Sequence, residues 1–248
     1  MHKQTAIAVD GLTVNFFGFA AITNLTMDLR YGETRAIIGP NGAGKTTLMD
    51  VITGKTRPTA GQVFLDGRVD LSTLDEAEIA RHGIGRKFQK PSTFEALRVE
   101  QNIELAVRKG QGYLAMLGSR LSGSQRGRID HVLETIGLRE LRQVPAGVLS
   151  HGQKQWLEIG MLLAADPKVL LLDEPVAGMT DQETARTVEL LSRLRSPERA
   201  IVVVEHDMAF VGEIADLVSV LHEGQMLNEG SMEKVRNDPR VIQVYLGR

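Results

Sequence analysis

The sequence has 248 residues, 42% of them hydrophobic and 24% charged, so the chain is long and apolar enough to bury a sizeable core. Its formal net charge of −2 gives no general attraction to nucleic acid or to anionic lipid. It contains no cysteine, which excludes disulfides, thiolate metal sites and cysteine nucleophiles. No stretch approaches the roughly 20 apolar residues of a membrane-spanning helix, so any action at a membrane is expected to depend on other proteins.

The first third of the chain is expected to consist mainly of strands. Apolar patterns predict strands over residues 6–16, 22–29, 35–38, 61–65 and 84–89. Asp66 and Gly67 form a hairpin-type turn after the fourth of these. A Gly-rich loop follows the third strand, and a helix is expected from residue 46 to about residue 53.

Helical patterns dominate the middle of the chain, and strands return after it. The expected helices cover residues 100–107, 128–136 and 152–163, with Gly-rich loops at 110–112 and 122–124. The later strands are expected at residues 169–172, 201–204 and 217–221, with helical stretches between them.

This order of elements predicts a parallel sheet with right-handed crossovers, because strands alternate with helices. We therefore predict an α/β fold in which residues 1–248 form a single domain. Its α/β core is expected at 1–90 and 166–248, and a helical subdomain is expected at 91–165.

The Gly-rich loop has the form of a phosphate-binding loop. Residues 39–46 read G-P-N-G-A-G-K-T, which fits G-x-x-x-x-G-K-[ST] between a predicted strand and a predicted helix. Glycines let the backbone approach phosphates closely, and the following helix adds its positive end. Lys45 can reach the β- and γ-phosphates, and the Thr46 hydroxyl can ligate Mg²⁺. The motif alone indicates a P-loop NTPase, with a chance match in a Gly-rich turn as the alternative. The residues expected to bind nucleotide here are Gly39, Asn41, Gly42, Ala43, Gly44, Lys45, Thr46 and Thr47.

Two adjacent acids follow the apolar strand expected at residues 169–172. Asp173 and Glu174 would lie at the carboxyl end of a parallel strand, the edge where such sheets bind ligands. Adjacent side chains on an extended chain point to opposite sides, so the two acids are expected to have different roles. Asp173 can hold Mg²⁺, and Glu174 can orient or deprotonate an attacking water. The alternative is a helix N-terminus, where acids are also favoured.

Residues 149–153 read L-S-H-G-Q and resemble the signature L-S-G-G-Q of the ABC (ATP-binding cassette) ATPase family. The resemblance extends over essentially the whole chain. It implies the P-loop NTPase ABC-ATPase fold, with N-terminal antiparallel strands and an inserted helical subdomain. It also implies that Ser150, Gly152 and Gln153 close on the γ-phosphate bound to an opposite subunit. Ser150 alone would be an ordinary helix N-cap.

Three further positions match functional positions of the ABC family. Phe17, just before Gly18, matches the aromatic residue that stacks on adenine, and a core or strand aromatic is its alternative. Gln89 matches the glutamine that senses Mg²⁺ and the attacking water. His206 matches the histidine that contacts the γ-phosphate, although a lone histidine after a strand is usually structural.

One loop departs from the family pattern. After Glu174 the chain reads P-V-A-G-M-T-D, so Thr180 stands where the family usually has aspartate, and Asp181 follows one residue later. In the family this loop couples the two ATP sites of a dimer. The departure therefore concerns communication between the sites.

The type of ABC protein is indicated by the end of the chain and by two internal stretches. The ending V-Y-L-G at residues 244–247 resembles subunits of branched-chain amino acid and amide importers, and lipopolysaccharide-export ATPases share it. Residues 151–161 and 173–181 most resemble the ATP-binding subunits of urea transporters. We therefore expect the ATP-hydrolysing subunit of an importer of urea or a related amide or branched-chain amino acid. An export ATPase and a soluble non-transport ABC ATPase are the alternatives, and the N-K-x-D motif of GTPases is absent.

The resemblance also implies ligands and partners. ATP and Mg²⁺ are the expected cofactors, and the expected partners are permease subunits, a second ABC ATPase subunit and, indirectly, a solute-binding protein, without nucleic acid. The expected location is the cytoplasmic face of the inner membrane. The residues with an expected catalytic role are Lys45, Gln89, Glu174 and His206. The expected metal-binding residues are Thr46, Gln89 and Asp173.

Overall fold

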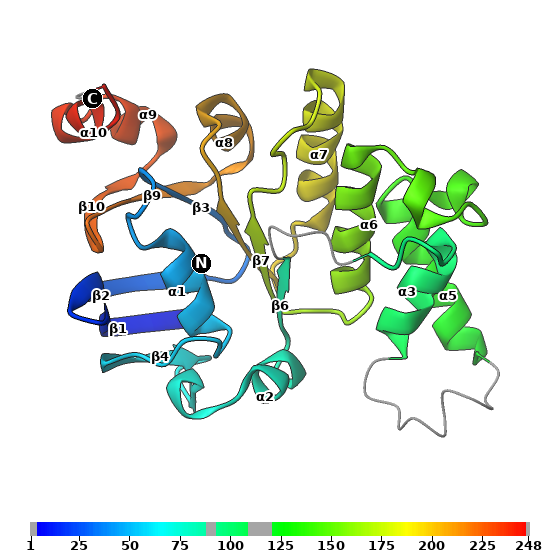
Figure 1. Ribbon diagram of the computed structural model, residues 1–248, viewed down its shortest axis with the longest axis horizontal. Coiled ribbons are helices and arrows are strands. Elements are labelled where there is room, and N and C mark those ends of the chain that lie inside the picture. The colour runs from blue at the N-terminus through cyan, green and yellow to red at the C-terminus, as the bar shows by residue number, and fades with distance from the viewer. Residues whose placement is uncertain (1–3, 88–92, 109–120, 247–248) are drawn as a thin grey trace. The chain divides into compact units, whose positions relative to one another are not determined.

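The computed structural model describes residues 4–87, 93–108 and 121–246. It confirms the α/β organisation, with an antiparallel sheet, a second sheet of mainly parallel strands, and helices (Figure 1). The chain divides into two compact units, one made of residues 1–86, 168–174 and 194–248 and the other of residues 87–167 and 175–193. The subdomain boundaries expected from the sequence, at residues 91 and 165, stay a prediction.

The antiparallel sheet belongs to the first unit and has the strand order β2-β1-β4-β5 within the described residues. Its strands are β1 (Thr5–Phe16), β2 (Phe19–Arg30), β4 (Ala60–Leu65) and β5 (Val69–Asp70). A two-residue turn at Phe17 and Gly18 joins β1 to β2, and both residues have positive φ, 47° and 88°. This kind of turn matches the right-handed twist of the strands that it connects.

The second sheet has the strand order β10-β9-β3-β8-β7-β6 in the part of the chain that the structure describes. Its strands are β3 (Thr34–Ile38), β6 (Ile84–Lys87), β7 (Val169–Asp173), β8 (Ala200–Val204), β9 (Leu217–His222) and β10 (Gln225–Gly230). Strand β3 pairs in parallel with β8 and β9, and β7 pairs in parallel with β8. Every residue of β3, β7 and β8 is buried, as expected for central parallel strands, and β7 and β8 have nearly continuous apolar sequences.

Helices cover both faces of this sheet in the first unit. Helix α1 (Lys45–Ile52) shares one apolar cluster with β1, β2, β3, β7 and β8, and so packs against both sheets. Residues of α8 (Met208–Ile214), α9 (Met232–Arg236) and α10 (Pro239–Leu246) form a second cluster with β3 and β9. The short helix α2 (Glu76–Arg81) begins with a capping box at Asp75 and Glu78.

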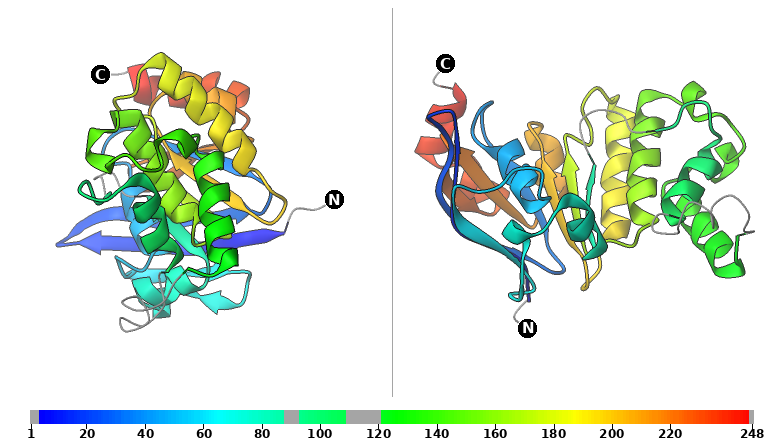
Figure 2. Two further views of the ribbon diagram at one scale, coloured as in Figure 1. Left: turned by 90° about the vertical axis from the view of Figure 1, so that its right-hand side faces the viewer. Right: turned by 60° about the horizontal axis from the view of Figure 1, so that its bottom comes forward.

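The second unit is helical. It contains α3 (Val99–Val107), α5 (Gly123–Thr135), α6 (His151–Leu163) and most of α7 (Asp181–Leu194). Helices α6 and α7 lie side by side (Figure 2), and the buried Trp156 of α6 donates from Nε1 to Thr187 Oγ1 of α7 over 2.9 Å.

One local expectation was wrong. The predicted Gly-rich loop at 122–124 is instead the start of α5, because Ser122 caps the helix. The Ser122 hydroxyl accepts from the Gln125 amide, and the Gln125 side chain accepts from the Ser122 amide, at 3.1 and 2.9 Å. The loop expected at 110–112 lies outside the described residues.

None of the described helices is long and apolar enough to cross a bilayer.

Candidate nucleotide-binding site

Three loops meet at the carboxyl edge of neighbouring parallel strands. The Gly-rich loop at 39–44 follows β3, His206 comes two residues after β8, and Glu174 directly follows β7. These strands are adjacent in the order β3-β8-β7, and their pairing is parallel. The edge formed by the carboxyl ends of such strands is where open α/β sheets bind ligands.

The backbone of the Gly-rich loop requires glycine and leaves space above it. Gly44 has φ 99°, and a Cβ on it would lie 2.6 Å from the carbonyl oxygen of Ala21. Gly42 has φ 81°, and a Cβ there would meet no atom within 4 Å. The loop is therefore tightly packed against β2 at Gly44 and has free space next to its backbone at Gly42. A backbone that binds phosphate through its amides needs such free space.

Lys45 is the buried cation of this loop. It is 6% exposed, and its Nζ donates to the carbonyl oxygens of Gly39 and Pro40 over 2.7 and 3.0 Å. Burial lowers the pKa of Lys45, and the nearby carboxylates of Glu174 and Asp173 act in the opposite direction. The ammonium group of Lys45 therefore bonds to the backbone of its own loop.

The other predicted residues of the loop differ in exposure. Asn41 and Thr46 are exposed, Thr47 is half-buried, and Ala43 is buried. Thr46 is in the first turn of α1, next to Lys45. Its hydroxyl is thus available to a ligand above the loop.

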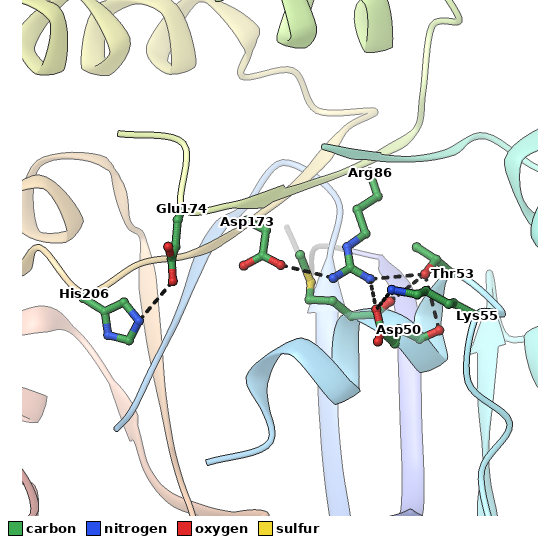
Figure 3. Close-up of polar contacts among 8 residues, drawn as sticks. Asp50, Thr53, Lys55, Arg86, Asp173, Glu174 and His206 are labelled. Carbon is green, nitrogen blue, oxygen red and sulfur yellow. Dashed lines mark hydrogen bonds and ion pairs between the residues drawn. The ribbon is translucent and has the colours of Figure 1, made fainter. Parts of the chain in front are cut away.

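The two adjacent acids make different contacts (Figure 3). Asp173 is 1% exposed, and its Oδ2 lies 3.1 Å from Nη2 of Arg86. The Oε1 atom of Glu174 lies 3.3 Å from Nε2 of His206. The backbone of Glu174 has φ 47°, which is uncommon for a residue other than glycine and which turns its side chain out of the strand pattern.

Phe17 lies at the tip of the β1–β2 hairpin. Its relative exposure is 111%, so the alternative of a core aromatic is wrong. Phe16 and Phe19, on either side of the turn, are also exposed. Such a ring presents a free face on which a flat ligand could stack.

The signature segment begins α6 in the second unit. The Ser150 hydroxyl accepts from the Gln153 amide over 3.2 Å, so the N-cap alternative is confirmed as a structural role. The same hydroxyl donates to Oε1 of Glu183 over 2.9 Å. A Cβ on Gly152 would lie 2.6 Å from Cδ of Glu183, so this carboxylate sits directly against the start of the helix.

Glu183 also contacts the loop that departs from the family pattern. The amide and the hydroxyl of Thr180 both donate to Glu183 Oε2 over 3.1 Å. The amide of Thr180 and then the hydroxyl of Ser150 lower the pKa of Glu183. In addition, His151 Nε2 lies 2.9 Å from the carbonyl oxygen of Ala177 in this loop.

Sequence reasoning did not identify Arg86 or Glu183. The pattern T-x-x-E at Thr180 and Glu183 is a capping-box signature and would have drawn attention to Glu183. No local pattern marks Arg86, because its partners are distant in the sequence. Gln89, expected near the metal, lies outside the described residues.

The match to a family model covers most of this site. Residues 22–177 match the model described as "ABC transporter". Residues 229–248 match a model described as "Branched-chain amino acid ATP-binding cassette transporter".

The chain is also similar to individual proteins along its whole length. It is 38% identical to the high-affinity branched-chain amino acid transport ATP-binding protein LivG of Salmonella typhimurium, over 99% of both chains. It is 35% identical to the corresponding protein BraF of Pseudomonas aeruginosa, again over 99% of both. The crystal structure of an ATP-binding cassette of an ABC transporter in its ADP conformation superposes with a TM-score of 0.88, at 28% identity, over 98% of this chain and 99% of that one.

The Gly-rich loop at 39–46 (the phosphate loop of the proposals below), the two acids and the signature segment thus belong to a chain whose sequence and fold match those of known ATP-binding cassettes. This chain belongs to the ABC transporter family, as an ATP-hydrolysing subunit.

Proposed function

We propose that this chain energises the import of branched-chain amino acids or of a related amide, with urea as the second candidate. The similarity to LivG and BraF and the C-terminal match at 229–248 support a branched-chain amino acid. The resemblance of residues 151–161 and 173–181 to urea-transporter subunits favours urea. These relatives are transport proteins, which favours a transporter subunit over a soluble non-transport ATPase.

The main support for the chemistry is the pair formed by Glu174 and His206. The two side chains approach to 3.3 Å at the sheet edge that also holds the phosphate loop. A carboxylate placed there can orient or deprotonate a water, and an imidazole can donate to a phosphate oxygen.

ATP binding would use the residues of the first unit. Lys45 would turn from the carbonyl oxygens of its own loop to the phosphates, and the amides at 41–46 would donate to them. Phe17 would stack on the adenine ring. Thr46 and Asp173, together with Gln89, would hold Mg²⁺, which usually takes one or two protein oxygens besides phosphate. Bound Mg²⁺ would neutralise charge on the phosphate oxygens.

Hydrolysis would require a second subunit. The Ser150 hydroxyl and the backbone at Gly152 and Gln153 of that subunit would close over the γ-phosphate and exclude water. Glu174 would then orient a water for in-line attack, while Lys45 and His206 stabilise charge on the phosphoryl group.

The remaining proposals concern partners and place. We expect the helical subdomain at 91–165 to pass the closing motion to permease subunits at the cytoplasmic face of the inner membrane. A solute-binding protein would act through the permease. The second ATPase subunit would be a copy of this chain or a related one.

The variant E174Q tests the proposed chemistry. It is expected to bind ATP, to form a lasting dimer in ATP, and to hydrolyse ATP at least about 100-fold more slowly, because it lacks the base. Light scattering measures the dimer, and phosphate release measures hydrolysis. The matched control is E213Q, since Glu213 is an exposed residue of α8. Hydrolysis by E174Q at the rate of the unmodified protein would contradict the role of Glu174.

A further inference from the structure

Arg86 is a buried cation between two carboxylates from different elements of the nucleotide site (Figure 3). Its side chain is 3% exposed, and its Nη2 lies 3.1 Å from Oδ2 of Asp173. Its Nη1 donates to Oδ1 of Asp50 and lies 3.5 Å from Oγ1 of Thr53. Asp50 belongs to α1, which begins at Lys45. One guanidinium therefore connects the end of β7 to the helix that follows the phosphate loop.

The chemistry of the guanidinium explains why arginine suits this place. Asp50 and Asp173 each place a carboxylate oxygen against the same guanidinium. The side chains of Asp50 and Asp173 are 16% and 2% exposed. Arginine presents several N–H donors in a fixed plane, so it can hold both carboxylates in a defined orientation, whereas lysine is a point charge.

A second cation near Asp50 gives a natural comparison. Nζ of Lys55 lies 3.6 Å from Oδ1 of Asp50, but the side chain of Lys55 is 52% exposed. An exposed pair at this distance contributes little to orientation. Only Arg86, of these two cations, also contacts Asp173.

We propose that Arg86 is a positioning residue for the metal ligand Asp173. By holding one oxygen of that carboxylate, it fixes the plane in which Asp173 faces a cation. Through Asp50, it also links this orientation to α1, the helix that follows the phosphate loop. The position of Asp173 relative to the phosphate loop is thereby fixed. The proposal rests on the metal-binding role of Asp173 given under the proposed function.

The test measures how ATP binding depends on Mg²⁺. A fluorescent ATP analogue is titrated into the full chain with EDTA and at increasing Mg²⁺ concentrations, without hydrolysis as a readout. For R86K, the Mg²⁺ concentration at half-effect is expected to rise about 10-fold, the usual loss when a residue that orients a metal ligand is replaced. Affinity in EDTA is expected to change less than about twofold, because no phosphate contact is lost. K55M is the matched control and is expected to leave both values unchanged.

Two more variants make every outcome decisive. D50N weakens the link to α1 and is expected to shift the Mg²⁺ dependence in the same direction by a smaller factor. If circular dichroism shows that R86K does not fold, D50N tests the positioning role in its place. An unchanged Mg²⁺ dependence in folded R86K, or in D50N in its place, would overturn the positioning role. D173N is expected to lose the Mg²⁺ effect; if it keeps that effect, the metal-binding role of Asp173 itself is wrong.

Discussion

At the scale of single residues, the adjacent carboxylates at the end of β7 have very different surroundings. The side chain of Asp173 is 2% exposed and faces a guanidinium, whereas that of Glu174 is 30% exposed and faces an imidazole. A carboxylate with one oxygen held by a fixed guanidinium has a defined orientation, which suits metal binding. A carboxylate next to an exposed imidazole has access to water, as a residue that orients water needs. The surroundings thus support the division of roles between them.

Replacing Phe17 is expected to change the affinity for ATP without changing the thermal stability of the protein. F17A is expected to weaken the binding of ATP about 10-fold, because aromatic–base stacking is worth about 1–3 kcal/mol. The melting temperature is expected to stay the same, since the side chain is fully exposed. Isothermal titration calorimetry and thermal unfolding measure the two quantities.

The control for Phe17 is its neighbour across the turn. Phe19 is 64% exposed, and F19A should leave ATP binding close to that of the unmodified protein if Phe17 is the stacking residue. F17W, which keeps an aromatic face, should restore binding. Equal losses in F17A and F19A would assign the adenine contact to the hairpin in general and not to Phe17.

At the scale of elements, the sequence correctly predicted those strands and loops that are determined by short local patterns, such as an apolar run or a Gly-rich motif. The buried strands β3, β7 and β8 were predicted within one or two residues of their bounds, because their apolar runs are short and continuous. The phosphate loop was placed between the correct strand and helix. Strand β10 was not predicted, since its residues are only partly buried and show no apolar pattern.

Contacts between distant positions were the part that sequence reasoning missed. Arg86 and Asp173 are 87 positions apart, and Ser150 and Glu183 are 33 apart. Both pairs form only after the sheet and the helices are assembled, so no local spacing reveals them. The position of Gln89 stays a prediction.

The contact between α6 and α7 has a functional consequence that can be tested. The Ser150 hydroxyl has one hydrogen, and it is donated to Glu183. If Ser150 binds a γ-phosphate as proposed, the carboxylate of Glu183 would compete with that phosphate for the same donor. E183Q keeps the capping box with Thr180 but removes the negative charge. In an E174Q background it is expected to form the ATP-dependent dimer at an about 10-fold lower ATP concentration, as measured by light scattering.

Two controls define the meaning of that result. Glu189 lies on the same helix with its side chain 68% exposed, and E189Q should leave the dimer unchanged. An E183Q dimer that needs as much ATP as its parent would show that Glu183 does not compete. S150A tests the signature itself, because a dimer that forms normally without this hydroxyl would remove Ser150 from the closure.

At the scale of the whole molecule, the residues proposed to act on ATP belong to two different compact units. The phosphate loop, Asp173, Glu174 and His206 belong to the first, and the signature segment at 149–153 belongs to the second. If the signature segment of one subunit completes the site of another, each subunit contributes both kinds of surface. A single chain would then bind ATP but hydrolyse it poorly.

Transport provides the prediction for the assembled system. Deleting the coding region of this chain is expected to abolish concentrative uptake of radiolabelled leucine by the host cells, and E174Q supplied in trans should not restore it. Uptake of radiolabelled urea is measured in parallel. Loss of urea uptake with normal leucine uptake would support the second candidate solute, and normal uptake of both would contradict the proposed function.

The left-handed backbone at Glu174 has a consequence for the stability of the protein. This conformation costs a residue with a Cβ about 1–2 kcal/mol, and glycine adopts it without that cost. The variant E174G is therefore expected to unfold at a higher temperature, and to lose the carboxylate that we propose orients the attacking water. Under the proposed role of Glu174, thermal stability and turnover are therefore expected to change in opposite directions when this one residue is replaced by glycine.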